Sequence, residues 1–291
     1  MSYQTIVNYT KKNDGYKNNG ALTVRGIMIH STATPGIMAK EFRERFNKAN
    51  LGKSVHGFID DKYYVQCLPY NKKAGHCRYN GNNTHIGIEL CEPKNWKTDK
   101  AYFEKVYANA VELAADLCKQ FGLTEANIID HAEGYKQGIA SNHADVGHWF
   151  PLFGKSMNTF RADVKEKLNV AAEAEKGKKQ IVKDLQRALN KDYNETLDVD
   201  GSFGKLTQAA VKRHYLKYKK GKTTTKGEFV EWVQTRLVNR GYYLGTYGVM
   251  KDGVDGSYGN ATAEAIGKFQ RDNKLTADKI AGLKTITKLI G

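Results

Sequence analysis

The sequence predicts an α/β fold, with a mixed central sheet flanked by helices, followed by a small helical region built from tandem repeats. Two observations predict this organisation. Short segments rich in β-branched residues, such as 24–31 (VRGIMIHS) and 85–91 (HIGIELC), are interleaved with longer segments of helical periodicity. The turn sequence DGSFG at 200–204 recurs as DGSYG at 255–259, and a helix-like segment follows each copy. A chain of 291 residues is long enough for two domains.

Two of the expected strands carry polar side chains where chemistry can occur. In the first strand, alternation places Ile29 on one face and His30 on the other, at the end of the strand. In the strand at 85–91, alternation leaves the carboxylate of Glu89 in an otherwise apolar segment. A buried carboxylate requires a partner, which is a metal, a catalytic water or a salt-bridging cation.

The remaining elements of the first domain follow from local patterns. Residues 57–68 (GFIDDKYYVQCL) predict a hairpin with two aspartates in its turn, and 127–130 predict a short strand. A helix is expected to follow Ser156, which is a suitable N-cap. Another is expected at 102–121, where apolar residues recur at helical spacing: Phe103, Val106, Ala110, Ala114, Leu117 and Phe121.

The chain is expected to divide near residue 170. Residues 171–180 (AAEAEKGKKQ) lack apolar periodicity and indicate a linker or a frayed helix end between domains 1–170 and 181–291. In the second domain, the repeats are expected at about 181–222 and 228–291. Seven of the eight histidines precede the boundary and only His214 follows it, so the chemistry is expected in the first domain.

Charge and cysteine content narrow the class of protein. The net charge is +15, with a surplus of 9 positive charges in residues 171–291. The positive charge predicts a polyanionic partner, for which nucleic acid, acidic membrane and anionic cell-wall polymer are candidates.

No apolar segment is long enough for membrane insertion, and the first residues lack the pattern of a secretory signal peptide. The cysteines show no paired spacing and are expected to be free thiols: Cys67, Cys77, Cys91 and Cys118.

The densest concentration of metal-binding side chains lies in 128–149 (IIDHAEGYKQGIASNHADVGHW). His131, His143, Asp145 and His148 crowd one segment there. A catalytic zinc takes three protein ligands and keeps a fourth position for water, whose pKa it lowers to about 7. Because no HExxH pair is present, the ligands are expected to come from separate strands and loops.

The segments IMIHSTATPG, SVHGFIDDKYYVQ, AGHCRYN and THIGIELCE precede this loop in the order found in type 2 N-acetylmuramoyl-L-alanine amidases. Residues 24–168 therefore resemble that family, which is related to peptidoglycan recognition proteins. The resemblance implies a Zn²⁺ ion held by His30, His131 and Asp145. It implies that Glu89 is the catalytic glutamate and that His143 stabilises the oxyanion. The bond implied joins N-acetylmuramic acid to L-alanine of the stem peptide.

This sequence departs from the family pattern at two places. Val55 stands where some relatives carry a catalytic tyrosine, so the catalytic role is expected to fall more on Glu89. The loop between His131 and Asp145 is longer than usual, so His143 remains an alternative third zinc ligand, with Asp145 then behind it. His56 and His76 are predicted to bind substrate along the groove, with support of the sheet as the alternative.

The second domain resembles peptidoglycan-binding domain 1 modules, in which a three-helix unit carries a D-G-x-[FY]-G turn. The resemblance implies that it anchors the enzyme to peptidoglycan, with anionic wall polymers as possible further partners. Several aromatic residues are candidates for stacking on sugars, with a place in the core as the alternative: Phe203, Trp232, Tyr242, Tyr243 and Tyr258.

The sequence thus predicts a zinc-dependent, endolysin-type peptidoglycan hydrolase. Without a signal peptide, it is expected in the cytoplasm of the host bacterium until release, and then at the cell wall. The alternatives are a bacterial autolysin, which usually carries a signal peptide, and a non-catalytic peptidoglycan-recognition protein, which would lack a zinc ligand. Nucleic acid is not expected as a partner, because no nucleic-acid-binding motif is present.

Overall fold

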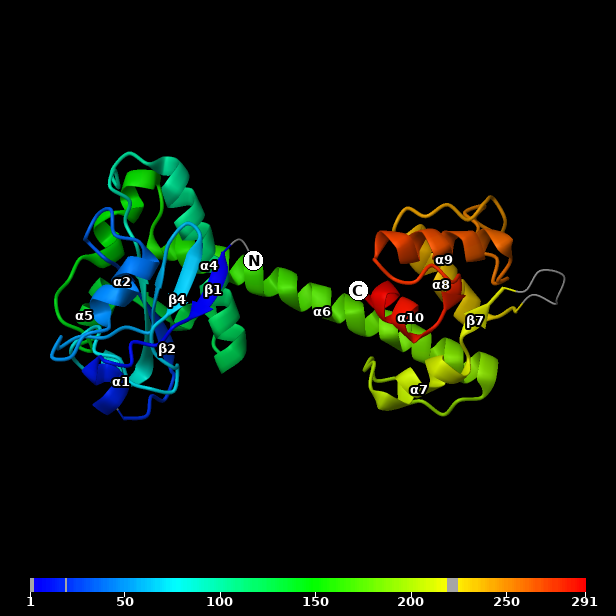
Figure 1. Cartoon of the computed structure of the whole chain (residues 1–291), viewed down its shortest axis with the longest axis horizontal. Coiled ribbons are helices and arrows are strands. Elements are labelled where there is room, and N and C mark those ends of the chain that lie inside the picture. The colour runs from blue at the N-terminus through cyan, green and yellow to red at the C-terminus, as the bar shows by residue number, and fades with distance from the viewer. Residues whose placement is uncertain (1–2, 19, 219–224) are drawn as a thin grey trace. The chain divides into compact units, whose positions relative to one another are not determined.

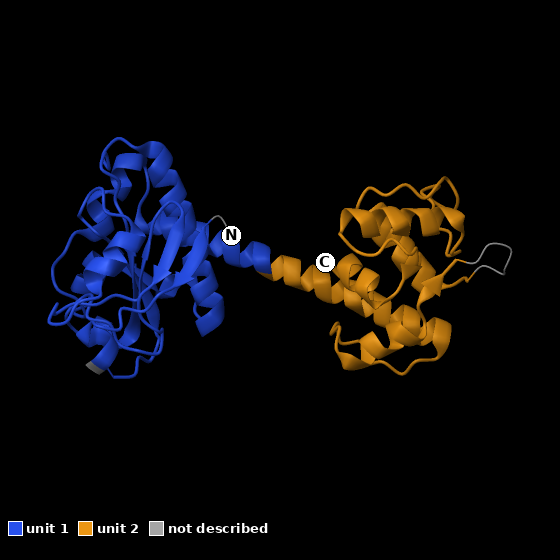
Figure 2. Cartoon of the chain, viewed as in Figure 1, with its two compact units in different colours: residues 1–171 blue, residues 172–291 orange. Residues whose placement is uncertain are grey.

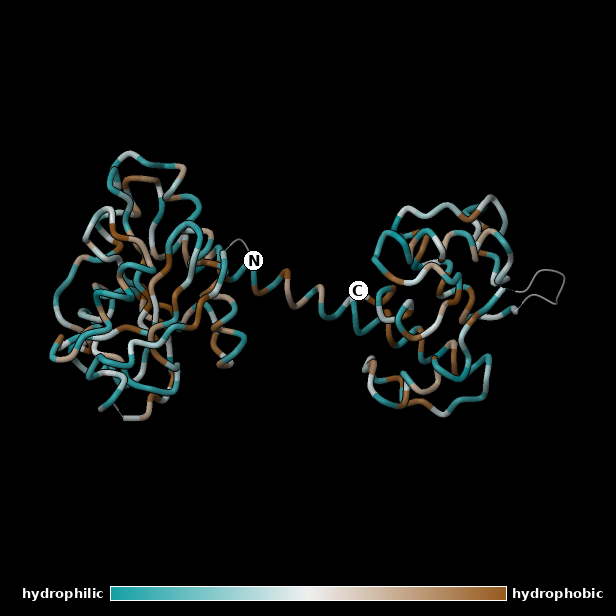
Figure 3. The backbone as a smooth tube through the Cα atoms, viewed as in Figure 1, coloured by the Kyte–Doolittle hydropathy of each residue, from teal (hydrophilic) through white to brown (hydrophobic). Residues whose placement is uncertain are grey.

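Two compact units divide the chain, Met1–Ala171 and Ala172–Gly291 (Figure 2). The computed structural model describes residues 3–18, 20–218 and 225–291. The expected end of the first repeat, at residue 222, lies outside the described residues. Hydrophobic positions gather in the interior of each unit, so each unit has a core of its own (Figure 3).

Unit 1 contains a mixed six-stranded sheet, as predicted (Figure 1). Its order is β1-β4-β3-β5-β2-β6. Strands β2, β5 and β6 are mutually parallel, and β3 and β4 form the antiparallel hairpin expected from the sequence. The strands are β1 (Gln4–Val7), β2 (Gly26–Ser31), β3 (Gly57–Ile59), β4 (Tyr63–Gln66), β5 (His85–Leu90) and β6 (Ile128–Asp130).

The longest helix within unit 1 is α4 (Lys100–Phe121), close to the predicted 102–121. The side chain of Asp99 caps its first turn by accepting a hydrogen bond from the Tyr102 amide, and Gly122 ends it in the left-handed region. The other helical segments of the unit are shorter: α1 (Asp14–Asn18), α2 (Ala39–Phe46), α3 (Gly81–Thr84), α5 (His131–Lys136) and the 3₁₀ turns η1 (Glu125–Asn127), η2 (Asp145–His148) and η3 (Phe150–Phe153).

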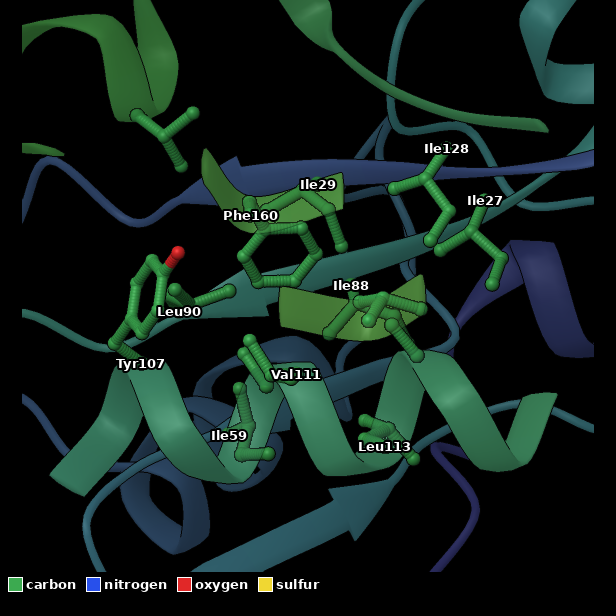
Figure 4. Packing of buried hydrophobic residues seen from close by; sticks show 14 of the residues in the cluster. Ile27, Ile29, Ile59, Ile88, Leu90, Tyr107, Val111, Leu113, Ile128 and Phe160 are labelled. Atoms are coloured by element: carbon green, nitrogen blue, oxygen red, sulfur yellow. The ribbon is translucent and has the colours of Figure 1, made fainter. Parts of the chain in front are cut away.

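The alternation predicted for β2 is present in the structure. Ile27 and Ile29 lie in the main core cluster, where side chains of β2 and β5 pack with those of α4 (Figure 4). Met28 belongs to a separate cluster with Cys77 and Ile129. His30 follows on the face of Met28, so the apolar packing of one face directs the histidine to the other.

Helix α6 (Met157–Tyr193) begins after Ser156 as predicted, with the Thr159 amide donating to Ser156 Oγ at 3.2 Å. It continues through 171–180, so the segment predicted to be a linker or a frayed helix end is helical. The segment contains no proline and a single glycine, and its other residues are Ala, Glu, Lys and Gln, which have high helix propensity. The lack of apolar periodicity in 171–180 therefore reflects a helix that is exposed on most of its surface.

Unit 2 surrounds one hydrophobic cluster that includes Leu189, Phe229 and Phe269. After α6 it contains α7 (Lys205–Arg213), β7 (Leu216–Lys217), α8 (Glu228–Val238), α9 (Asn260–Asp272), β8 (Ile280–Ala281) and α10 (Leu283–Ile290). Of the candidate sugar-stacking residues, Trp232 and Tyr258 are buried in this cluster, whereas Tyr243 is 79% exposed.

In the described part of unit 2 the turn motif occurs three times, once more than the sequence predicts. In the second copy, Gln234 Nε2 donates to Asp255 Oδ1 at 2.7 Å, and Gln234 Oε1 accepts from the Gly256 amide at 2.8 Å. Gln186 makes the same contacts with Asp200 and Gly201, and Gln270 makes them with Asp278 and Lys279. The residue after each aspartate has a positive φ, which is 80° for Gly201, 66° for Gly256 and 57° for Lys279. Because lysine replaces glycine in the third copy, the turn there lost its sequence signature while keeping its geometry.

Two further expectations are tested by the fold. All four cysteines are free and buried. Within the described residues, none of the helices combines the length and the apolar character needed to cross a lipid bilayer.

Candidate functional site

The site lies at the carboxyl ends of three neighbouring parallel strands. His30 on β2 is in register with Glu89 on β5, and Ile29 is in register with Asp130 at the end of β6. His131 follows Asp130 directly and begins α5. Crossovers between parallel strands bring these segments, far apart in sequence, to one edge of the sheet, which is where open α/β folds bind ligands.

Helix α5 holds His131 in place through its cap. The Asp130 side chain accepts from the Glu133 amide at 2.7 Å, and the Glu133 carboxylate accepts from the Asp130 amide at 3.2 Å. Arg161 of α6 binds both oxygens of Glu133, at 2.8 and 3.0 Å. The bidentate pair ties the first turn of α5 to α6.

Three of the predicted residues converge. Asp145 Oδ2 lies 3.0 Å from His30 Nδ1 and 2.7 Å from His131 Nδ1, and the three ligand atoms lie within 4.8 Å of one another. Burial alone would raise the pKa of the Asp145 carboxyl, but hydrogen bonds from His131 and His30 outweigh it and lower the pKa well below its usual range. The group therefore consists of two imidazoles and an anionic oxygen.

The loop that carries Asp145 is held in place by His148 and Glu92. Asp145 has φ of 38°, a left-handed conformation that aspartate tolerates better than most residues. His148 Nδ1 contacts the Asp145 carbonyl oxygen, and His148 Nε2 lies 3.0 Å from Glu92 Oε1. The same Glu92 oxygen accepts from the Ala33 amide at 3.2 Å, so Glu92 joins the loop after β2 to the Asp145 loop. Nothing in the sequence indicated this role for Glu92, which lies two residues after the end of the strand that carries Glu89.

Glu89 is a half-buried residue whose carboxylate has no salt-bridge partner among the described residues. Its Oε2 atom is buried and has no hydrogen-bond partner among the described residues. Burial raises the pKa of the Glu89 carboxyl to about 7, although the nearby His30 opposes the rise. A carboxyl group poised near neutral pH, on a residue that lines a cavity, is suited to general acid–base chemistry.

A cavity of about 770 Å³ opens over this group. Glu89 and the three converging residues line it, and so do Lys53 and Arg78, the other charged side chains of its wall besides histidines. This volume suits a substrate fragment larger than a single amino acid.

His143 lines the cavity without joining the three converging residues. Its ring centroid lies 4.9 Å from that of His131, with the rings tilted by 32°, and the residue is exposed. The geometry thus favours Asp145 over His143 as the third metal ligand, and it leaves the imidazole of His143 open toward the cavity.

Of the two roles predicted for His56, its surroundings favour support of the sheet over substrate binding. His56 is fully buried, its Nε2 donates to the Lys72 carbonyl at 2.8 Å, and its Nδ1 accepts from the Gly87 amide at 3.0 Å. Burial lowers the pKa of His56 to about 4, although the bond to the Lys72 carbonyl opposes the fall. Both ring nitrogens are used by the backbone, so this histidine supports the sheet. His76 does line the cavity, but it too is hydrogen-bonded at both nitrogens.

Comparison with known proteins agrees with this geometry. The family profile described as N-acetylmuramoyl-L-alanine amidase matches residues 20–148, and the profile described as putative peptidoglycan binding domain matches residues 226–289. N-acetylmuramoyl-L-alanine amidase XlyA of Bacillus subtilis (strain 168) is 30% identical over 270 residues, covering 88% of each chain. N-acetylmuramoyl-L-alanine amidase CwlL of Bacillus licheniformis is 27% identical over 361 residues, covering 98% of each.

Among solved structures, the crystal structure of Staphylococcus aureus hydrolase AmiA in complex with its ligand resembles this chain with a TM-score of 0.51. The sequences are 20% identical, and the match covers 60% of this chain and 87% of that chain. This likeness concerns the fold, which is the mixed α/β arrangement that the sequence predicts.

Proposed function

The chain belongs to the N-acetylmuramoyl-L-alanine amidase family, and on that premise we propose that it is an endolysin-type enzyme that hydrolyses its substrate amide with a zinc-activated water. The observation that carries the proposal is the convergence of His30, His131 and Asp145 beside the unpartnered oxygen of Glu89. The bond cleaved joins the lactyl group of N-acetylmuramic acid to L-alanine, and the substrate is peptidoglycan.

Zinc fits the donor set that this chain presents. Two imidazole nitrogens and one carboxylate oxygen, supplied by separate segments, form a ligand combination used by catalytic zinc sites. When bound by His30, His131 and Asp145, the ion would polarise the scissile carbonyl and lower the pKa of a water molecule to about 7.

Glu89 would move the proton in this reaction. Its carboxylate would accept a proton from the attacking water and return it to the nitrogen of L-alanine as the C–N bond breaks. The products are a carboxylate on the lactyl group and a free amino group on the stem peptide. A pKa of about 7 suits both halves of this task, because the same oxygen must bind and then release the proton.

His143 would donate a hydrogen bond to the carbonyl oxygen as that oxygen gains negative charge. It lines the cavity beside His131, and its ring is exposed, so no described group competes for the donor. A donor directed at developing charge contributes most to catalysis when it is already in place before the reaction.

Unit 2 would concentrate the enzyme on its substrate. The peptidoglycan-binding profile covers α8, α9 and α10, and the surplus of positive charge in 171–291 suits the anionic polymers of a bacterial wall. A tethered binding domain raises the local concentration of the catalytic unit at the wall.

The proposal is tested by digesting purified cell walls with the full chain. Digestion should release new amino termini of L-alanine without new reducing sugars, should stop with a zinc chelator and should resume when zinc is returned. His131→Ala and Asp145→Ala should abolish both activity and stoichiometric zinc, whereas His214→Ala, a histidine of unit 2, should leave both unchanged. New reducing ends, or full activity in the chelated protein, would overturn the proposal.

A further inference from the structure

A chain of hydrogen bonds leads from the backbone of β5 to the candidate metal ligand His30. His76 Nε2 lies 3.1 Å from the His85 carbonyl oxygen, and His76 Nδ1 lies 2.8 Å from His30 Nε2. A carbonyl oxygen can only accept a hydrogen bond, so Nε2 of His76 must carry the proton. In a neutral imidazole the other nitrogen is then an acceptor, so Nδ1 of His76 accepts from the Nε2–H of His30.

The direction of these bonds decides which nitrogen of His30 is available. With its proton on Nε2, a neutral His30 presents a bare lone pair at Nδ1. That atom faces Asp145 Oδ2 at 3.0 Å, which is also an acceptor. Two acceptors at this distance require a positive charge between them: in the metal-free chain a second proton on His30 bridges Nδ1 and Asp145 Oδ2, and a metal ion bound by both atoms would take the place of that proton.

The space for the His76 ring depends on a glycine in β5. A Cβ atom at Gly87 would lie 2.5 Å from Cγ of His76 and 2.7 Å from its Nδ1, so any larger residue would displace the ring. The Gly87 amide is itself held by His56 Nδ1 at 3.0 Å, which fixes the strand at this point. Buried histidines and a glycine therefore place the His76 ring against β5.

We propose that His76 is a positioning residue, which fixes the tautomer of His30 and thereby commits Nδ1 of His30 to the metal. This inference rests on the zinc site of the proposed function. Because both nitrogens of His76 are occupied, His76 is neither a fourth ligand nor a substrate-binding group, although it lines the cavity. The role differs from the substrate contact that the sequence predicts for this residue. Hydrogen-bond partners of metal-binding histidines fix ring orientation and raise ligand basicity, and their loss weakens metal affinity about 10- to 100-fold.

The first test measures zinc and cobalt(II) affinity of the metal-free full chain, by competition with a chromophoric chelator. His76→Leu should weaken zinc about 10- to 100-fold, because it removes the acceptor and frees His30 to change tautomer. His76→Asn should restore most of that affinity, since its Oδ1 stands where Nδ1 stood and accepts from the same Nε2–H. The control is His85→Asn, which alters a neighbouring ring but keeps the carbonyl of the chain, and it should bind zinc like the wild type.

The outcomes separate this inference from the proposed function. A wild-type chain that binds no zinc would remove the proposed function and this inference together. Tight zinc binding by the wild type, with His76→Leu equally tight or His76→Asn as weak as His76→Leu, would overturn the role of His76 alone. An equal loss in the His85→Asn control would do the same, because the effect would then be general to this strand.

A second test uses the glycine. Gly87→Ala should weaken zinc about tenfold in the chain that carries His76, because it displaces the ring. In a His76→Ala background the added methyl group meets no ring, so Gly87→Ala should change the affinity less than twofold. Equal losses in both backgrounds would show that Gly87 acts on the strand rather than through His76, and would overturn the inference. Circular dichroism melting of each variant confirms that the compared proteins are folded.

Discussion

Glu89→Gln should make the enzyme more stable and almost inactive, and both effects follow from one buried oxygen. Glutamine keeps the shape of the side chain and removes both its charge and its ability to take a proton. If the Glu89 carboxylate moves the proton, kcat should fall by about 10²- to 10⁴-fold. Zinc affinity should stay near that of the wild type, because Glu89 lies outside the group formed by His30, His131 and Asp145.

The gain in stability can be estimated from the pKa of the Glu89 carboxyl. Burial raises that pKa from 4.5 to about 7, so the folded state holds a proton that the unfolded state releases above pH 4.5. The stabilising effect of that proton is complete below pH 4.5 and is lost as the pH rises through 7. A difference of about 2.5 pKa units corresponds to roughly 3 kcal/mol. Glu89→Gln escapes this loss, so the metal-free variant should exceed the wild type by about 3 kcal/mol at pH 8 and match it at pH 4.5.

The assay is urea unfolding of the chelated full chain at several pH values, with wall hydrolysis measured on the zinc-loaded proteins. Glu104→Gln is the matched control, because Glu104 is an exposed glutamate of α4 with a side chain 64% exposed, and it should change neither quantity. A stability difference that does not vary with pH would refute the assignment of a raised pKa. Normal kcat in Glu89→Gln would refute its role as the base.

Four further predictions follow from other contacts. His143→Ala should lower kcat about 10²- to 10³-fold with zinc affinity unchanged, measured by wall hydrolysis beside zinc titration. Gln234→Leu should lower the unfolding free energy of unit 2 by about 2–4 kcal/mol, because it leaves the hydrogen-bond acceptors of Gln234 Nε2 on Asp255, Ser257 and Thr262 without that donor. Urea unfolding measures this loss. In the Glu89→Gln variant, which lacks the opposing titration of Glu89, the pKa of His56 near 4 should cost about 3 kcal/mol of stability as the pH falls from 6.5 to 4, and a flat unfolding free energy of that variant would contradict this. Tyr243→Ala should weaken pelleting with walls without lowering the melting temperature, since the side chain is 79% exposed.

The sequence predicted correctly those strands and helices whose apolar residues recur with a clear period. β2 and α4 bury an apolar face along their whole length, so period 2 or period 3.6 is visible in the residues themselves. The placement of His30 and Glu89 followed from the same alternation, because a strand cannot change the face of one residue without changing all of them.

Predictions failed where the outcome depends on something other than a local apolar pattern. The exposed helical segment at 171–180 has no apolar face to detect, and only the helix propensity of its residues would have revealed it. The third turn of unit 2 was missed because Lys279 takes the left-handed position that glycine holds in the other two. The role of His56 stayed open between substrate binding and support of the sheet, because the sequence does not show whether the nitrogens of a histidine face solvent or backbone.

The choice between Asp145 and His143 as third ligand shows why a site is harder to predict than a sheet. Both residues lie in one loop, two positions apart, and both are chemically competent to bind zinc. What separates them is the loop conformation: a left-handed residue at Asp145, a carbonyl held by His148, and the link from His148 through Glu92 to the end of β2. Those contacts turn the carboxylate toward His30 and leave His143 at the cavity wall. Weakening them with Glu92→Gln should therefore lower zinc affinity without removing a ligand, whereas an unchanged affinity would mean that the ligand geometry is held by the histidines alone.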